Sequence, residues 1–328
     1  MIKAMYSGVS GMKANQTKLD VIGNNVANAG TTSFKKSSAR ISDSFYQTVL
    51  YASAPTAALG GTNLGQVGVG SKISSINKDM TQGNVQATNR RSDLMIDGDG
   101  YFPVVRQGTV MYTRDGSFNL DTGFTAKDGA LKDIKGGRLT NGEGYMLQGE
   151  IYDGTYDADT GVFTKNGAAK GKEPIVIPLQ NIAPDGTVQN VLEYSISKDG
   201  TVEFLLSNGE RTQFIYQVPA GKEVGDNAGL GADALKKGTI QKVQIYGFQN
   251  PAGLDAAGGN MFKPSANSGD AQIAGATGTI IQGAIEASNV DIAEEFTEMI
   301  IASRSFQANS KIISTSDEIL QEIINLKR

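Results

Sequence analysis

The sequence predicts a mainly β protein whose N- and C-terminal ends are α-helices that pair as a coiled coil. Glycine and proline, which break helices, supply the first observation. The chain of 328 residues has 41 Gly and 8 Pro. Residues 285–328 contain neither, residues 1–45 contain four glycines and no proline, and all the others lie in the middle. Seven-residue apolar repeats at both ends and hairpin signals between them complete the argument.

The N-terminal segment has an apolar seam typical of a coiled-coil helix. Its apolar residues follow alternating steps of four and three over about three heptads, with two positions filled by other residues. The seam consists of Met5, Val9, Met12, Leu19 and Val26. This pattern predicts a helix that buries one face against another helix.

The C-terminal segment shows a stricter repeat. The residues that recur every seven positions are Ile292, Met299, Phe306, Ile313 and Leu320, and Phe296 widens their stripe. Residues 288–291 offer a capping box ahead of this run. About 37 residues with a rise of 1.5 Å each make a helix on the order of 55 Å long. An ordinary core helix would drift away from a strict seven-residue repeat, so the pattern favours a coiled coil.

The charges of the two ends are opposite. Residues 1–45 carry six basic and two acidic side chains, and residues 285–328 carry four basic and eight acidic side chains. Two amphipathic helices of opposite charge are therefore expected to pair with each other. The alternative is that each stripe packs on the β body of its own chain.

Short β-rich runs alternate with turn signals in the middle of the chain. Residues 194–197 precede a Lys-Asp-Gly turn, and residues 202–206 precede a Ser-Asn-Gly turn. Such pairs between apolar runs indicate antiparallel hairpins. The expected domains are a terminal helical domain (1–45 with 285–328), a connector (46–74), a first β domain (75–148 with 239–284) and a second β domain inserted into it (149–238).

Composition excludes several kinds of chemistry. The chain has no Cys, His or Trp, so disulfides, thiolate nucleophiles, Cys/His zinc sites and Ser-His-Asp triads are absent. Residues 97–100, Asp-Gly-Asp-Gly, begin like a calcium loop, but Tyr101 occupies the next ligand position and no Glu follows at the required distance. We expect no enzyme activity, no cofactor and no metal. A net charge of −4 without a basic run argues against nucleic-acid binding, and no apolar stretch is long enough to span a membrane.

Several motifs occur in a fixed order along the chain. They are NNVANAGTTSFK at residues 24–35, DGDGYF at 97–102, YTRDGSF at 112–118, NPAGL at 250–254, EASNVD at 286–291 and RSFQAN at 304–309. The signature residues of the terminal motifs are Asn24, Asn25, Asn28, Phe34, Ser288, Asn289, Val290 and Asp291. Together these motifs resemble the bacterial flagellar rod and hook proteins.

The resemblance implies a terminal coiled-coil domain with nested β domains and a structural role. The chain would self-assemble into the axial tube of the flagellum after export by the flagellar type III apparatus. The expected partners are other copies of the chain, the distal rod, the hook cap and the hook–filament junction proteins. In this interpretation the predicted seam packs helices of many copies into an inner tube.

Two alternatives follow from the same residues. The inserted second β domain and the C-terminal sequence favour the extracellular hook, whereas the modest size of the insertion leaves the distal rod as the alternative. The rival from another class is a secreted β-rich carbohydrate-binding protein or enzyme with helical tails. An aromatic content of 7% without Trp argues against a sugar-binding platform.

Overall fold

A computed structural model shows the chain folded into two compact units. The first comprises Met1–Thr81 and Ser288–Arg328, and the second comprises Gln82–Ala287. The structure describes residues 2–55, 60–125, 134–157, 162–183, 185–216, 218, 222–229, 237–273 and 278–326. The chain therefore passes between the units twice, once in each direction.

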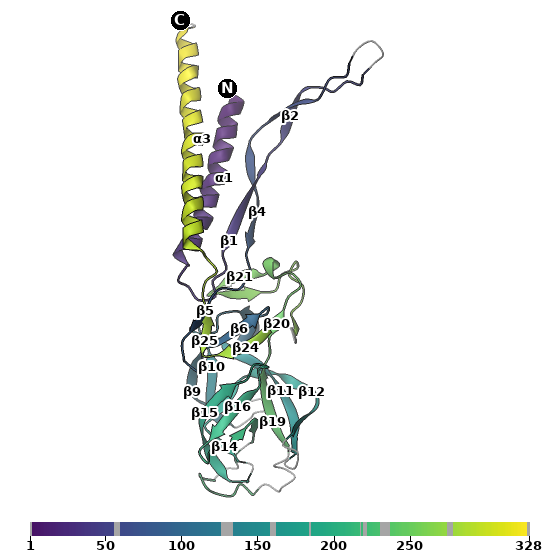
Figure 1. Cartoon of the computed structure of the whole chain (residues 1–328), viewed down its shortest axis with the longest axis vertical. Coiled ribbons are helices and arrows are strands. Elements are labelled where there is room, and N and C mark those ends of the chain that lie inside the picture. The colour runs from purple at the N-terminus through teal and green to yellow at the C-terminus, as the bar shows by residue number, and fades with distance from the viewer. Residues whose placement is uncertain are drawn as a thin grey trace. The chain divides into compact units, whose positions relative to one another are not determined.

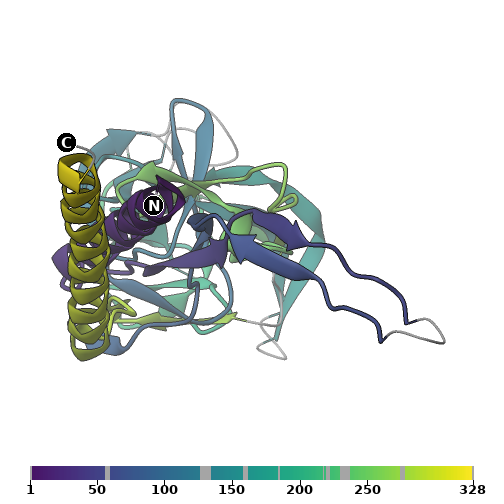
Figure 2. The same ribbon diagram turned by 90° about the horizontal axis from the view of Figure 1, so that it is seen from above.

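The first unit contains the two long helices, α1 (Ile2–Ala27) and α3 (Ile292–Leu326). They lie side by side in both views of the ribbon (Figures 1 and 2), which confirms the predicted pairing of the two ends. The Asp291 carboxylate caps α3, because its Oδ1 accepts from the backbone N–H groups of Ala293 at 2.9 Å and Glu294 at 3.3 Å. The cap therefore lies at Asp291 with Glu294 three residues later, and not at Ser288 as the predicted capping box required.

A long antiparallel hairpin completes the first unit. Its strands are β1 (Ser37–Asp43), β2 (Tyr46–Leu50), β3 (Gly65–Gly68) and β4 (Ser71–Lys78). Strand β1 pairs with β4, and β2 pairs with β3. α1 contacts both β1 and β4, and the outer part of the hairpin extends away from the helices (Figure 2). Strands therefore lie within the stretch for which composition indicated only a connector.

The second unit is built from short antiparallel strands. Its first half contains β5 (Val85–Ala87), β6 (Leu94–Gly98), β7 (Phe102–Arg106), β8 (Thr109–Thr113), β9 (Asn119–Thr125), β10 (Lys135–Thr140), β11 (Met146–Asp157), β12 (Val162–Pro174), β13 (Val176–Pro178) and β14 (Gln180–Ile182). Its second half contains β15 (Val188–Ile196), β16 (Val202–Leu206), β17 (Arg211–Thr212), β18 (Phe214–Ile215), β19 (Lys237–Val243), β20 (Tyr246–Gly247), the 3-10 turn η1 (Pro251–Gly253), β21 (Asp255–Gly258), β22 (Met261–Lys263), β23 (Gln272–Ile273), β24 (Gly278–Gln282) and β25 (Ala284–Glu286).

These strands form one large sheet and several small ones. The large sheet follows the order β13-β10-β11-β7-β8-β22-β21, with β9, β12, β18 and β19 attached beside that path. Strands β14 to β17 form a four-stranded sheet in sequence order. Its turns contain Gly200 and Gly209, which have φ values of 89° and 86°. The left-handed conformation at both positions favours glycine, and the two predicted hairpins are confirmed.

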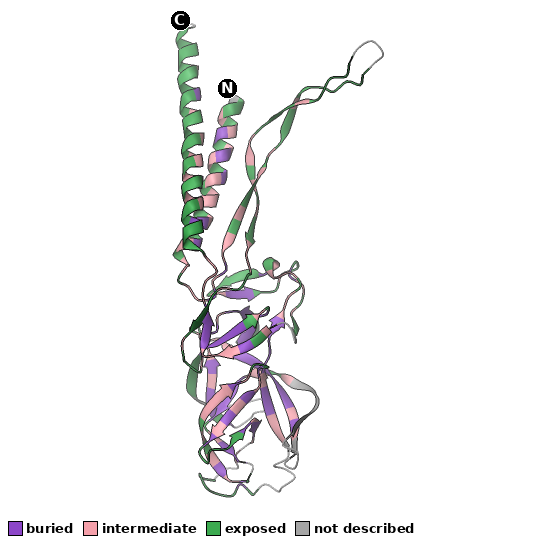
Figure 3. Ribbon diagram, viewed as in Figure 1, coloured by how far each residue is buried: buried purple, intermediate pink, exposed green. Residues whose placement is uncertain are grey.

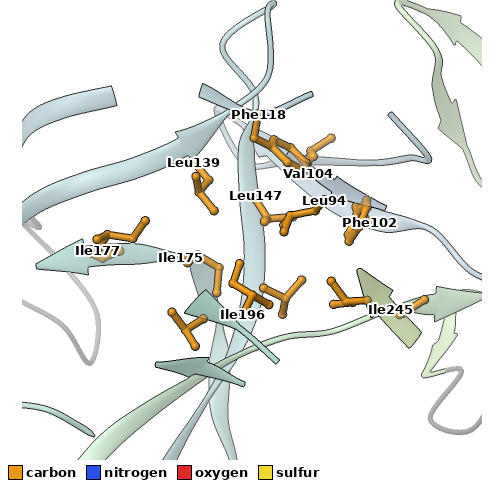
Figure 4. Close-up of a cluster of buried hydrophobic side chains, with 14 of the residues drawn as sticks. Leu94, Phe102, Val104, Phe118, Leu139, Leu147, Ile175, Ile177, Ile196 and Ile245 are labelled. Atoms are coloured by element: carbon orange, nitrogen blue, oxygen red, sulfur yellow. The ribbon is translucent and has the colours of Figure 1, made fainter. Parts of the chain in front are cut away.

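An extensive apolar cluster packs among the strands of the second unit, beside a smaller cluster of Ile182, Val188 and Ala228. The larger cluster includes Leu94, Phe102, Phe118, Leu147 and Phe204, all fully buried. Figure 4 shows side chains from distant parts of the sequence pointing toward a common centre, and Figure 3 shows that buried residues concentrate in these strands. Members of the larger cluster come from both expected β domains. The division at residues 149–238 stays a prediction, and part of that stretch, including residues 158–161 and 230–236, lies outside the described residues.

Candidate functional site

The contact between α1 and α3 is lined by small side chains. Gly8, Gly11 and Ala14 are buried on α1. A Cβ atom on Gly8 would lie 3.2 Å from Cγ1 of Ile313, and one on Gly11 would lie 2.8 Å from Nδ2 of Asn309. Because a larger residue would contact the facing helix at these distances, the two glycines allow the helices to approach closely.

The facing line of α3 has its own seven-residue spacing. It consists of Glu295, Ala302, Asn309 and Ser316, of which all but Asn309 are buried. It runs beside the predicted stripe, because positions separated by three or four residues share one face of a helix. Sequence reasoning missed this line because it sought apolar residues, although the same spacing was present in small and polar ones.

The structure places the predicted seam residues at the border of this contact. Met5, Met12, Leu19 and Val26 are half-buried, and so are Met299, Phe306, Ile313 and Leu320. Val9, Ile292 and Phe296 are exposed, with 37%, 50% and 48% of their surfaces accessible. The contact within one chain therefore covers the predicted seam only in part.

Seven further large apolar side chains of α3 are exposed in the part of the chain that the structure describes. We call this set the exposed α3 face; it consists of Ile300, Ile301, Ile312, Ile319, Ile323, Ile324 and Leu326. Figure 3 shows α3 as exposed along most of its length. Exposed apolar side chains that gather on one element are typical of interaction surfaces.

Ion pairs join the oppositely charged ends. Lys18 Nζ lies 3.0 Å from Glu298 Oε2, and Lys36 Nζ lies 3.0 Å from Glu294 Oε2. The hydrogen bond to Glu294 raises the pKa of Lys36 above its ordinary value. Both pairs are partly exposed, so each adds little stability, but together they favour the observed pairing of the helices.

A buried polar cluster links the end of α1, the start of β1 and the first turn of α3. The Asn25 side chain is 1% exposed. Its Nδ2 donates to Glu295 Oε2 at 3.0 Å and to the Ser37 carbonyl at 2.8 Å, and its Oδ1 accepts from the Ser37 N–H at 2.9 Å. Asn25 therefore satisfies groups from two segments that are far apart in the sequence.

The Asn289 side chain, in the C-terminal motif, also hydrogen-bonds to segments that are distant in the sequence. Its Oδ1 accepts from the Lys36 N–H at 2.8 Å, and its Nδ2 donates to the carbonyls of Asp79 at 2.9 Å and Thr81 at 3.3 Å. Its backbone N–H donates to the Phe34 carbonyl at 3.3 Å. These bonds join the segment before α3 to the roots of the hairpin.

The remaining signature residues lie close to these two asparagines in the sequence. Asn28 Nδ2 donates to the Asn24 carbonyl at 2.9 Å, at the end of α1. The Ser288 hydroxyl accepts from the Val290 N–H at 3.3 Å, and Asp291 caps α3. The terminal motifs thus shape the ends of the helices and the roots of the hairpin.

Among the residues that the structure describes, no group of three or more acidic side chains is arranged to hold a metal ion. Across the same residues, no helix is long and apolar enough to cross a membrane.

Family models match three parts of the chain. The model "Flagella basal body rod protein" matches residues 5–35, and "Flagellar basal body rod FlgEFG protein C-terminal" matches residues 281–326. The model "Flagellar hook protein FlgE/F/G D1 domain" matches residues 95–204. The chain is also 38% identical to the flagellar basal-body rod protein FlgG of Bacillus subtilis over 333 residues, with full coverage of both chains. The chain belongs to the flagellar rod and hook protein family.

Other members of the flagellar rod and hook family are similar over the same extent. In Borreliella burgdorferi, the basal-body rod protein FlgG is 33% identical over 335 residues, and the hook protein FlgE is 29% identical over 441 residues. All of this chain and all of each relative are covered. The chain is therefore a structural axial subunit of the bacterial flagellum, as the resemblance implied.

Proposed function

We propose that this chain is a rod subunit that self-assembles into the axial tube of the flagellar basal body. The observation that carries the proposal is the agreement in length. The alignment with the Bacillus rod protein spans 333 residues for a chain of 328, whereas the alignments with two hook proteins extend to 441 and 464. A hook protein of those sizes needs long insertions that this chain lacks.

The hook is the second candidate, which the predicted second β domain and the C-terminal sequence favour. The hook protein of Borreliella aligns along the whole chain at 29% identity, close to the 33% of the rod protein from the same organism. The D1 family model names hook and rod members together. Under this alternative the chain forms the extracellular hook and meets the distal rod, the hook cap and the hook–filament junction proteins.

The helices support a role in assembly. Exposure of the apolar side chains of the exposed α3 face to water is unfavourable. Burial of apolar surface against another copy would stabilise the assembly by about 25 cal/mol per Å². In a tube of repeated copies, helices of neighbouring copies cover this face and the half-buried predicted seam. Export through the flagellar type III apparatus then precedes assembly, since the subunit must reach the growing end of the tube.

The chromosomal deletion distinguishes rod from hook. Basal bodies purified from a strain without this gene are imaged by electron microscopy, with the complemented strain as control. We expect truncated rods without hooks. Basal bodies that end at a complete rod would contradict the rod assignment and support the hook, and intact filaments would contradict both.

A further inference from the structure

The chain enters and leaves the second unit through two short segments that pair with each other. We call residues 82–87 and 284–287 the crossing segments. They contain β5 and β25, whose antiparallel register places Val85 opposite Glu286. The Ala287 N–H also donates to the Asn84 carbonyl at 2.8 Å. The two passages of the chain thus pair as one β ladder.

The two strands differ in how they are held. All three residues of β25 are buried, whereas all three residues of β5 are exposed. The incoming segment therefore gains little from apolar burial of its own strand. Its position depends on hydrogen bonds to its neighbours.

A buried ion pair lies at this ladder. The side chain of Glu286 is 1% exposed and that of Arg114 is 3% exposed, and Nη1 of Arg114 lies 3.5 Å from Oε1 of Glu286. The same Oε1 accepts from the Gly83 N–H at 2.8 Å. Arg114 also donates from Nε to the Gly100 carbonyl at 3.0 Å and from Nη2 to the Gly98 carbonyl at 2.8 Å.

The Arg114–Glu286 pair lies where both crossing segments meet the β body, and its bonds indicate a role in holding them. Replacement of a buried ion pair by apolar side chains of similar volume is often neutral or stabilising, so burial of this pair does not by itself indicate a role in core stability. It supplies directional bonds, and these run from the β body through Arg114 to Glu286 and on to Gly83. One carboxylate thereby holds the outgoing segment, the incoming segment and the body together.

We propose that Arg114 and Glu286 form a clamp that fixes both crossing segments to the β body. Force that reaches the second unit through either passage of the chain is then shared by both. The use of this clamp in a rotating tube rests on the proposed function, whereas the local claim concerns one subunit and is tested without assembly.

Amide hydrogen exchange on the full-length monomer tests the clamp. The double variant Arg114→Met with Glu286→Leu keeps the buried volume and removes the polar bonds. We expect exchange at Gly83 and Ala287 to accelerate at least tenfold. Exchange at Val191 and Val243, whose N–H groups donate within the body, should change less than twofold.

A matched control separates loss of the clamp from a general effect of removing an ion pair. Glu193→Gln removes a partly exposed ion pair with Arg91 in the same unit and should alter neither crossing segment. If the double variant does not fold, Glu286→Gln is measured in its place, and a local acceleration of at least threefold is expected. Uniform acceleration across the unit, or unchanged exchange at Gly83, would overturn the clamp.

Discussion

Substitution of glycines along α1 separates close helix contact from helix propensity. Gly11→Ala and Gly23→Ala change the same residue type on the same helix. A Cβ on Gly23 meets nothing within 4 Å, whereas a Cβ on Gly11 lies 2.8 Å from Asn309 Nδ2. Both variants gain about 1 kcal/mol of helix propensity, so their difference measures the contact alone.

The expected difference is about 1 kcal/mol, the low end of the usual cost of overpacking, because the Cβ would meet only the end of the Asn309 side chain, which can rotate away. Gly23→Ala should stabilise the helix pair by up to about 1 kcal/mol, and Gly11→Ala should be neutral or destabilising. Circular dichroism at 222 nm in increasing urea reports this, because most of the helical signal comes from α1 and α3. Equal stabilisation by both substitutions would refute the close packing of Gly11 on Asn309.

Two further predictions concern the stripe and the β unit. Phe306→Asp places a charge in the half-buried stripe at a cost of several kcal/mol, so tube assembly and motility should be lost. The melting temperature of the β unit should stay unchanged in Phe306→Asp. The control variant Ser303→Ala should still assemble. A lowered melting temperature in Phe306→Asp would show instead that the stripe packs on the β unit of its own chain. Burial raises the pKa of Tyr101 and of Tyr216 to about 12, against about 10 when unfolded. Their contribution to stability is complete below pH 10 and is lost as the pH rises through 12. The urea midpoint of the β unit should therefore fall between pH 10 and pH 12. The fall should be smaller in Tyr216→Phe, which has one titrating group fewer.

The helices and the β body were predictable because their signals are local. A seven-residue repeat and the absence of Gly and Pro specify a long helix whatever it packs against. Asp-Gly and Asn-Gly turns specify hairpins in the same way, because glycine adopts the left-handed conformation at low cost. Residues 199–200 and 208–209 lie at such turns between paired strands.

The long hairpin was not predictable from these signals. A strand is recognised by alternation of buried and exposed residues, and β2 and β3 bury no residue fully on either face. Their pairing rests on backbone hydrogen bonds and on register, which leave little trace in composition. A stretch rich in Ala, Gly, Ser and Thr therefore indicated a connector.

The partner of each signature residue was likewise hidden. Asn25 and Asn289 belong to motifs whose importance the resemblance implied, but a motif does not say what its side chains bind. Asn25 bonds Glu295, which lies 270 positions away. A buried amide needs partners, and only the folded chain shows that they come from the start of α3 and of β1.

The polar contacts between α1 and α3 can specify the register of the two helices, which the apolar stripe alone cannot do. A stripe that repeats every seven residues would pack almost equally well if α3 slid by one heptad along α1. Such a shift would bring Ala302 opposite Asn25 in place of Glu295, and it would leave the buried amide without its carboxylate partner. Single polar positions specify register in coiled coils for this reason. The half-buried apolar stripe therefore contributes to association without fixing its register, and the Asn25–Glu295 bond and the Lys18–Glu298 pair favour the observed one.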